Sequence, residues 1–331
     1  MPSLSEFTLI YRYFSALGRG DAVDLSVGDD CAILRLEEGE RLAVSVDTMV
    51  VGVHFPEDSF PEDIGFRVVS AAASDLAAMG ARPVGMTVAL TLSEVDELWL
   101  HAFSQGLAAA VSEYELPLVG GDTTRGPLTI TVQVMGALPT DRALLRVGAR
   151  VGDGVYVSGT LGDAAGGLAF LQGQWQPEPD AAEYLLDRFN RPRARIALGR
   201  ELLGRATAAI DISDGLLADA GHIAAASGVK ICIEPDLLPL SDALSSYGAQ
   251  PPQNPQGFHD THDSQDTQGI HNPADQVMQW ALTGGDDYEL CFCLPVGEQP
   301  PEDCTLIGRV EAGQGVDCGL DIDIKAGYQH F

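Results

Sequence analysis

One stretch of the sequence decides how the fold is read: Leu42-Ala43-Val44-Ser45-Val46-Asp47-Thr48-Met49-Val50-Val51-Gly52-Val53-His54-Phe55. Its first half alternates small and β-branched residues as a buried strand does, and it ends on an acid, a hydroxyl and a histidine. A rigid strand therefore delivers polar groups to one place. Three other segments end in a similar way: Gly28-Asp29-Asp30, Gly120-Gly121-Asp122-Thr123-Thr124 and Asp211-Ile212-Ser213-Asp214-Gly215.

Acids that recur at strand ends beside glycines and hydroxyls indicate oxygen ligands that converge on hard divalent cations. Magnesium is the cation most often held in this way beside phosphates. The sequence contains neither the P-loop pattern GxxxxGK followed by Ser or Thr nor the protein-kinase signatures. Aspartates and the backbone amides of glycines would then hold the phosphates through more than one magnesium ion. The pattern predicts a metal-dependent phosphoryl-transfer enzyme.

The composition narrows the classes of partner. The chain has 331 residues, enough for two domains, and a formal net charge of -29, which argues against nucleic acid or an anionic membrane surface as partner. It contains no run of about 18 apolar residues, and its N-terminus lacks the basic and apolar regions of a signal peptide. We therefore expect a soluble, cytoplasmic protein. The six cysteines contain no CxxC spacing, so neither a zinc site nor a disulfide framework is indicated.

The order of predicted elements divides the chain in two. The first part reads as α-β-β-α-β-α-β-β, with helices over 6–17, 61–79 and 94–114 and later strands over 84–92, 116–119 and 128–138. A glycine-rich turn, Gly148 to Gly154, leads into a second part with strands over 155–158, 230–234 and 288–294 and helices over 181–189 and 192–205. We expect domains over 1–148 and 149–331, with the polar segment 250–275 as a disordered insertion.

Seven motifs occur in the order and spacing of the thiamine-monophosphate kinase family, which the chain resembles over its whole length apart from 250–275. They are Gly28-Asp29-Asp30-Cys31-Ala32, Ser45-Val46-Asp47-Thr48, Gly52-Val53-His54-Phe55, Ser74-Asp75-Leu76-Ala77-Ala78-Met79-Gly80-Ala81, Gly120-Gly121-Asp122-Thr123-Thr124-Arg125-Gly126, Asp211-Ile212-Ser213-Asp214-Gly215-Leu216 and Gly284-Gly285-Asp286-Asp287-Tyr288-Glu289-Leu290. Any one of these motifs alone would be weak evidence, but seven in register are specific.

The resemblance implies an α+β, two-domain fold of the aminoimidazole ribonucleotide synthetase type. Its N-terminal domain would bind ATP and magnesium and form a β-barrel shared within a homodimer, and its C-terminal α/β domain would lie on the substrate side. The implied reaction is ATP-dependent phosphorylation of thiamine monophosphate to thiamine diphosphate, the last step of thiamine diphosphate biosynthesis. The acceptor is a phosphate monoester, already largely a dianion at neutral pH, so no catalytic base is expected.

The resemblance also assigns roles to single residues. The implied magnesium ligands are Asp30, Ser45, Asp47, Asp75, Asp122, Asp211 and Asp214. The implied ATP contacts are Gly121, Asp122, Arg146 and Ser213, and the implied substrate contacts are His54, Asp286 and Tyr328. The sequence departs from the family pattern at Val46, where threonine is frequent, and at Asp286, where glutamate is usual and the carboxylate is shorter by one methylene.

Several of these residues also have structural interpretations. Asp29 is either a further candidate ligand or a residue that caps its own turn. His54 could instead be a histidine at a strand end whose hydrogen bonds are satisfied within the protein. Arg146 could be a surface arginine, and Tyr328 could be a packing residue. The turn 159–163 before a helix is an anion site or a structural turn. The histidines of the insertion, His259, His262 and His271, read as a metal-binding tract or as part of a solvated loop.

Two other functions stay open at this point. One is another ATP-using member of the same superfamily with a different acceptor, although no N-terminal catalytic Cys or Lys and no C-terminal cysteine motif of such relatives is visible. The other is a non-catalytic acidic protein that binds divalent cations, which would predict repeated DxDxDG loops; the sequence has none.

Overall fold

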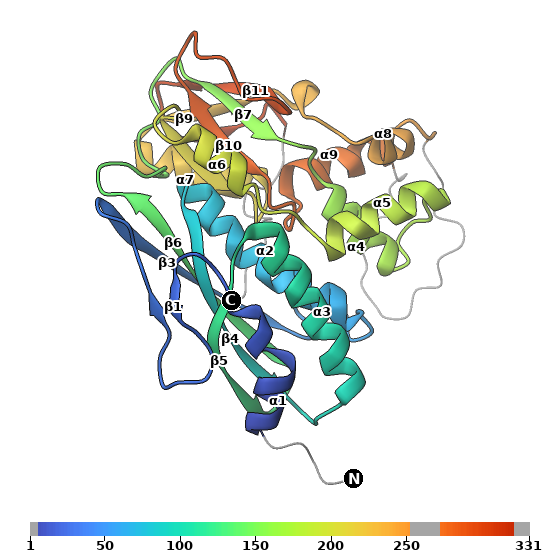
Figure 1. Cartoon of the computed structure of the whole chain (residues 1–331). Coiled ribbons are helices and arrows are strands. Elements are labelled where there is room, and N and C mark those ends of the chain that lie inside the picture. Colours follow the sequence, from blue (N-terminus) through green and yellow to red (C-terminus); the bar gives the residue numbers. More distant parts are fainter. Residues whose placement is uncertain (1–5, 252–271, 321–331) are drawn as a thin grey trace.

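The computed structural model describes residues 6–251 and 272–320. The chain builds two units in succession, a lower one and an upper one in Figure 1. The elements in chain order are α1 Glu6–Tyr13, the 3-10 helix η1 Ser15–Leu17, β1 Val23–Leu25, β2 Ile33–Leu34, β3 Glu40–Val50, α2 Pro61–Met79, β4 Arg82–Leu92, α3 Glu97–Tyr114, β5 Leu118–Arg125, β6 Thr129–Pro139, β7 Gly154–Ser158, α4 Asp163–Leu171, α5 Pro179–Asn190, α6 Ile196–Leu202, β8 Ala208–Asp211, α7 Leu216–Ser227, β9 Lys230–Ile233, the 3-10 helix η2 Pro235–Leu237, α8 Asp242–Gly248, α9 Pro273–Thr283, β10 Leu290–Leu294, β11 Cys304–Glu311 and β12 Gly315–Asp317.

The first unit is a four-stranded sheet with the strand order β3-β6-β4-β5, covered on one face by α2 and α3 (Figure 1). β3 and β6 pair antiparallel along their full length, whereas β4 and β5 run parallel. Side chains alternate along β3, so Ser45 and Asp47 point toward the helices. The opposite positions Leu42, Val44 and Val46 stay 48%, 52% and 58% exposed.

Helix α2 lies at the centre of the molecule and contacts elements of both units. It begins at Pro61 with two acids in its first turn and ends at Gly80, which has a left-handed φ of 72°. Its alanine-rich surface lets neighbours approach closely. A β-carbon on Gly199 of α6 would lie 1.9 Å from the carbonyl oxygen of Ala77, and one on Gly106 of α3 would lie 1.9 Å from that of Glu62.

The second unit is a six-stranded sheet with the strand order β12-β9-β11-β7-β10-β8. Every neighbouring pair is antiparallel except β9 and β12. The expected C-terminal α/β domain is therefore corrected to an α+β arrangement, because the strands return as antiparallel neighbours. Helices α4, α5, α8 and α9 gather beside this sheet, on the right of Figure 1.

Local geometry explains where predicted boundaries moved. α3 begins at Glu97 rather than 94 because the Asp96 carboxylate caps it, accepting the backbone hydrogen of Leu98 at 2.8 Å. β10 begins at Leu290 rather than 288 because Tyr288 has a φ of 51°, which lies outside the β region. α6 covers only Ile196–Leu202 of the predicted 192–205, and α9 begins at Pro273, inside the segment expected to be an insertion. Residues 252–271 of that segment, with its three histidines, lie outside the described residues.

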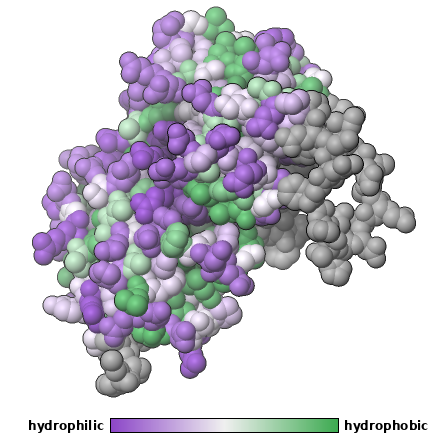
Figure 2. All heavy atoms as spheres, turned by 90° about the vertical axis from the view of Figure 1, so that its right-hand side faces the viewer, coloured by the Kyte–Doolittle hydropathy of each residue, from purple (hydrophilic) through white to green (hydrophobic). Residues whose placement is uncertain are grey.

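In the two described ranges, none of the helices has the length and apolarity that a membrane crossing requires. Hydrophilic side chains predominate on the face shown in Figure 2, and hydrophobic residues form separate patches between them.

Candidate active site

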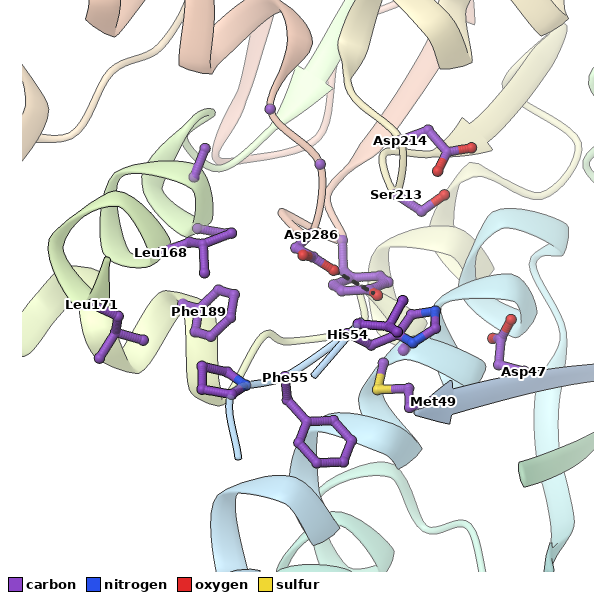
Figure 3. Close-up of a pocket in the computed structure, with 18 of the residues that line it drawn as sticks. Asp47, Met49, His54, Phe55, Leu168, Leu171, Phe189, Ser213, Asp214 and Asp286 are labelled. Atoms are coloured by element: carbon purple, nitrogen blue, oxygen red, sulfur yellow. Dashed lines mark hydrogen bonds between the residues drawn. The ribbon is translucent and has the colours of Figure 1, made fainter. Parts of the chain in front are cut away.

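A cavity of about 990 Å³ lies between the two units. Its walls come from the end of β3 and the loop after it, from α2, α4 and α5, and from the loops before α7 and before β10. In Figure 3 the carboxylates of Asp47 and Asp214 lie on one side, the side chains of Leu168 and Phe189 on the other, and Asp286 between them. The cavity thus has an acidic end and an apolar end.

Three carboxylates from three elements line the acidic end: Asp47 on β3, Asp75 on α2 and Asp211 on β8. The Ser45 hydroxyl on β3 donates to Asp75 Oδ2 on α2 at 2.5 Å, and Asp211 is the last residue of β8 and is buried. Burial, followed by the charge of Asp75, raises the pKa of Asp47 to about 6 and that of Asp211 to about 7. These acids are therefore close enough to repel one another.

This donor set fits a magnesium ion. It contains only carboxylate and hydroxyl oxygens, and a divalent charge would offset both the burial of the acids and their mutual repulsion. Among the described residues, no group of three or more His, Cys, Asp or Glu side chains could hold a metal ion by itself. Magnesium suits such a site because it takes one or two carboxylates and completes its shell with water and phosphate oxygens.

The turn between β8 and α7 is held by one buried acid that the sequence analysis did not single out. Asp219 Oδ2 accepts the backbone hydrogens of Ser213, Asp214 and Gly215 at 3.0, 3.0 and 3.1 Å. Burial, followed by the charge of Asp211, raises the pKa of Asp219 to about 8. The backbone N–H of Ser213 is bonded to Asp219, and Ser213 lines the cavity, so a ligand there would be contacted by its side chain. In the sequence, the feature that could have pointed to Asp219 is its place as an acid in the first turn of a helix.

His54 and Asp286 lie between the two ends of the cavity (Figure 3). The backbone N–H of Val50 donates to His54 Nδ1 at 3.0 Å, so in the neutral ring Nε2 carries the hydrogen. The Asp286 carboxylate accepts a hydrogen bond from the Tyr288 hydroxyl at 3.1 Å and pairs with Arg67 at 3.0 Å. The cavity therefore has a histidine in a defined tautomer and an anchored acid at mid-length.

The apolar end is lined by Phe55, Leu168, Leu171 and Phe189, which come from the loop after β3, from α4 and from α5. Aromatic and aliphatic side chains with one acid nearby are suited to a flat organic ring that carries a positive charge. The two ends together fit a molecule with phosphate at one end and a cationic ring at the other.

The other predicted site residues that the structure describes, Asp30, Gly121, Asp122 and Arg146, do not line this cavity. Asp29 Oδ1 accepts the backbone hydrogen of Asp30 at 2.8 Å, as expected of an acid that caps its own turn. Asp122, which follows Gly121 on β5, is exposed, and its Oδ1 accepts the backbone hydrogen of Thr123 at 2.9 Å. Arg146 is exposed in the segment between β6 and β7. Tyr328 lies outside the described residues.

A buried ionic cluster fixes the loop that carries Asp286. Glu289 is fully buried and accepts from the Ser158 hydroxyl at 2.5 Å, from Arg188 at 2.9 Å and from Arg195 Nε at 2.6 Å. The neighbouring Asp287 accepts the backbone hydrogen of Gly162 at 2.7 Å. The signal in the sequence was an acid next to an apolar strand, but its distant partners could not be read from the chain.

Comparison with known proteins places the chain in a family. A family model described as AIR synthase related protein, N-terminal domain, matches residues 28–138. The thiamine-monophosphate kinase of Salmonella typhimurium is 46% identical over 344 residues, which cover 98% of this chain and 98% of that protein. The chain belongs to the thiamine-monophosphate kinase family. The family predicted from the seven motifs is thereby confirmed.

Solved structures of this family share the fold. The thiamine-monophosphate kinase of Stenotrophomonas maltophilia K279a superposes with a TM-score of 0.78 at 40% identity, covering 90% of this chain and 92% of that one. AaThiL complexed with AMPPCP and TMP gives a TM-score of 0.76 at 34% identity, covering 90% and 89%. The expected α+β fold of the aminoimidazole ribonucleotide synthetase type is therefore confirmed, while the barrel shared by two subunits stays a prediction.

Proposed function

We propose that this protein transfers the γ-phosphoryl group of ATP to thiamine monophosphate, giving thiamine diphosphate and ADP. The observation that carries the proposal is the cavity with an acidic end and an apolar end in a chain of this family. A phosphate oxygen of the acceptor bonds to the γ-phosphorus, and the bond from that phosphorus to the β–γ bridging oxygen breaks. The acceptor phosphate, with a second pKa of about 6, is already largely a dianion at neutral pH, so no side chain has to remove a proton.

The acidic end is the proposed phosphate-transfer region. Asp47, Asp75 and Asp211 with the Ser45 hydroxyl would hold magnesium, and Asp214 faces the same space. Bound magnesium supplies positive charge that offsets the repulsion between two polyanions. The chain itself supplies rigid positioning, since β3, α2 and β8 are all fixed by their sheets and packing. Asp30 and Asp122 are part of the proposed ligand set, and Gly121, Arg146 and Ser213 of the proposed ATP contacts.

The other end is the proposed thiamine region. Nε2–H of His54 donates to the phosphate ester, and Asp286 balances the charge of the thiazolium ring, which lies against the apolar wall around Phe189. Asp286 is one methylene shorter than a glutamate, and its carboxylate is held by Arg67 and the Tyr288 hydroxyl. Tyr328 remains a predicted substrate contact.

We also propose a homodimer joined through the outer face of the first sheet. Leu42, Val44 and Val46 expose about half of their surface on consecutive outward positions of β3. An apolar strip of this kind on a sheet favours burial against a second copy. The assignment of residues 1–148 to ATP binding and dimerisation and of residues 149–331 to the substrate side belongs to this proposal.

The test is a magnesium-dependent assay with ATP and either thiamine monophosphate or free thiamine as acceptor. We expect diphosphate from the monophosphate alone, and we expect Asp47→Asn and Asp122→Asn to lower the rate by about a hundredfold or more. ATP consumption without phosphorylation of either acceptor would move the assignment to another acceptor within the superfamily. Normal activity of Asp122→Asn would remove that residue from the ligand set.

A further inference from the structure

Arg67 is a buried arginine that contacts three residues of the cavity lining and does not itself line the cavity. It lies on α2 with 3% of its side chain exposed. Its Nη2 atom lies 3.0 Å from Asp286 Oδ2 and 3.5 Å from the carbonyl oxygen of His54, and its Nη1 atom donates to the carbonyl oxygen of Phe189. One guanidinium thus joins the loop after β3, the end of α5 and the loop before β10.

The contact with Phe189 has a second component. The guanidinium carbon lies 4.2 Å from the centre of the Phe189 ring, within the range of a cation–π interaction. A planar fork with several N–H donors can serve two carbonyls, one carboxylate and one ring face at the same time, whereas a lysine ammonium has neither the reach nor the planarity to do so.

Asp286 depends on such support because its backbone is in an unfavourable region. Its φ is 68°, and that of Tyr288 is 51°, in the left-handed region that non-glycine residues seldom adopt. The loop keeps this conformation because the backbone N–H of Asp286 donates to the Ser213 carbonyl at 2.9 Å and because Arg67 and the Tyr288 hydroxyl each hold one carboxylate oxygen. Loss of Arg67 would leave one carboxylate oxygen free to move.

We propose that Arg67 is a positioning residue for the thiamine monophosphate acceptor. It fixes His54, Phe189 and Asp286 relative to one another, and these three residues lie at the middle and the apolar end of the cavity. This inference rests on the proposed function, because those three residues are the proposed walls of the thiamine region. The competing interpretation is an ion pair that merely holds the two units together.

The chain offers a matched control for that interpretation. Arg191, just after α5, places its Nε atom 2.6 Å from Asp63 Oδ1 at the start of α2, and its guanidinium lies 5.6 Å from the Phe66 ring centre. It therefore links α5 to α2 by an ion pair and a ring contact, the same two kinds of contact that Arg67 makes, although the ion pair of Arg67 goes to the loop before β10. None of Arg191, Asp63 and Phe66 lines the cavity.

The experiment compares full-length wild type, Arg67→Met, Arg67→Lys and Arg191→Met. The KM for thiamine monophosphate at saturating ATP, the KM for ATP and the thermal midpoint are measured for each. We expect the KM for thiamine monophosphate to rise about tenfold to a hundredfold in Arg67→Met and less in Arg67→Lys, which keeps the charge. In both Arg67 variants the KM for ATP should stay within about twofold of the wild-type value. In Arg191→Met the KM values for both substrates should stay within about twofold of wild type, even if the thermal midpoint falls.

Each other outcome counts against the proposal. An unchanged KM for thiamine monophosphate in the Arg67 variants, or an equal rise of the KM for both substrates, would show that Arg67 has only a structural role. Neither result would affect the proposed reaction. The same rise in Arg191→Met would likewise reduce Arg67 to a structural role. If Arg67→Met does not fold, Arg67→Lys decides alone. A wild type that forms no diphosphate from thiamine monophosphate would overturn the proposed function and this inference with it.

Discussion

The carboxylate of Asp219 lies 3.0 Å from the backbone nitrogen of Asp214 and accepts its hydrogen. Two further amides, those of Ser213 and Gly215, point at the same oxygen. A proposed magnesium ligand and a proposed ATP contact therefore owe their positions to an acid that lines no part of the cavity.

Replacing Asp219 tests that dependence. Asp219→Ala leaves three backbone donors without their acceptor and should lower the free energy of unfolding by about 2–4 kcal/mol and the kinase rate by about tenfold or more. Asp219→Asn keeps one acceptor oxygen and should lose less of both. Urea unfolding and steady-state rates measure the two effects, with Asp242→Ala, an exposed acid in the first turn of α8, as the control. Equal losses in the control variant would contradict the prediction.

Asp75 is expected to destabilise the metal-free protein and to be required for magnesium binding. Its charge raises the pKa of both Asp47 and Asp211, so Asp75→Asn should relieve the repulsion and stabilise the metal-free protein by about 0.5–1 kcal/mol. The variant should also lose the stabilisation that magnesium gives the wild type, and its rate should fall by about a hundredfold. Thermal unfolding with magnesium chloride and with a chelator checks this. Asp141→Asn, on an exposed turn, should behave as wild type in both conditions.

Two adjacent glycines on β5 should differ sharply. A β-carbon on Gly121 would lie 2.0 Å from the carbonyl oxygen of Val88 on β4, whereas one on Gly120 would lie 3.6 Å from the Thr87 side chain. Gly121→Ala should therefore lower the free energy of unfolding by about 2–4 kcal/mol, and Gly120→Ala by less than about 1 kcal/mol. Chemical denaturation of the two variants gives the comparison, and similar values for both would show that β4 and β5 can move apart.

The proposed dimer predicts an effect of charge on the outer face of β3. Val46 is 58% exposed there, and an aspartate at this position would place an unpaired charge in the proposed interface. Val46→Asp should shift the protein from dimer to monomer and weaken association by about a hundredfold or more. Sedimentation velocity measures the shift. Val296→Asp, at an 83% exposed valine after β10, should leave the assembly unchanged, and a monomeric wild type would refute the interface.

The sequence predicted those features that depend on local pattern. Pro61 and Gly80 mark the two ends of α2 in the sequence as they do in the structure, because a proline at the first turn and a left-handed glycine at the last are local requirements. Ser45, Asp47, Asp75 and Asp211 were expected to converge; the three acids line one end of one cavity, and the Ser45 hydroxyl donates to Asp75.

Features that depend on distant partners escaped sequence reasoning. Glu289 meets Arg188 and Arg195, which lie 101 and 94 residues earlier in the chain, and no spacing rule connects them. In the sequence, Arg67 is indistinguishable from any other polar residue of α2, because its partner Asp286 lies far away in the chain. Asp30, Asp122 and Arg146 are not among the residues that line the cavity, and their roles stay predictions.

The close packing around α2 has a consequence for how this sequence can drift over evolutionary time. At Gly106 and Gly199 any side chain would collide with the backbone of α2, so a mutation at either position would push that helix away from its neighbour. The residues that line the cavity belong to elements on both sides of α2. Such a displacement would therefore misalign the cavity walls without changing a residue that touches a ligand. Random mutagenesis should therefore find inactive variants at these two glycines as readily as among the aspartates.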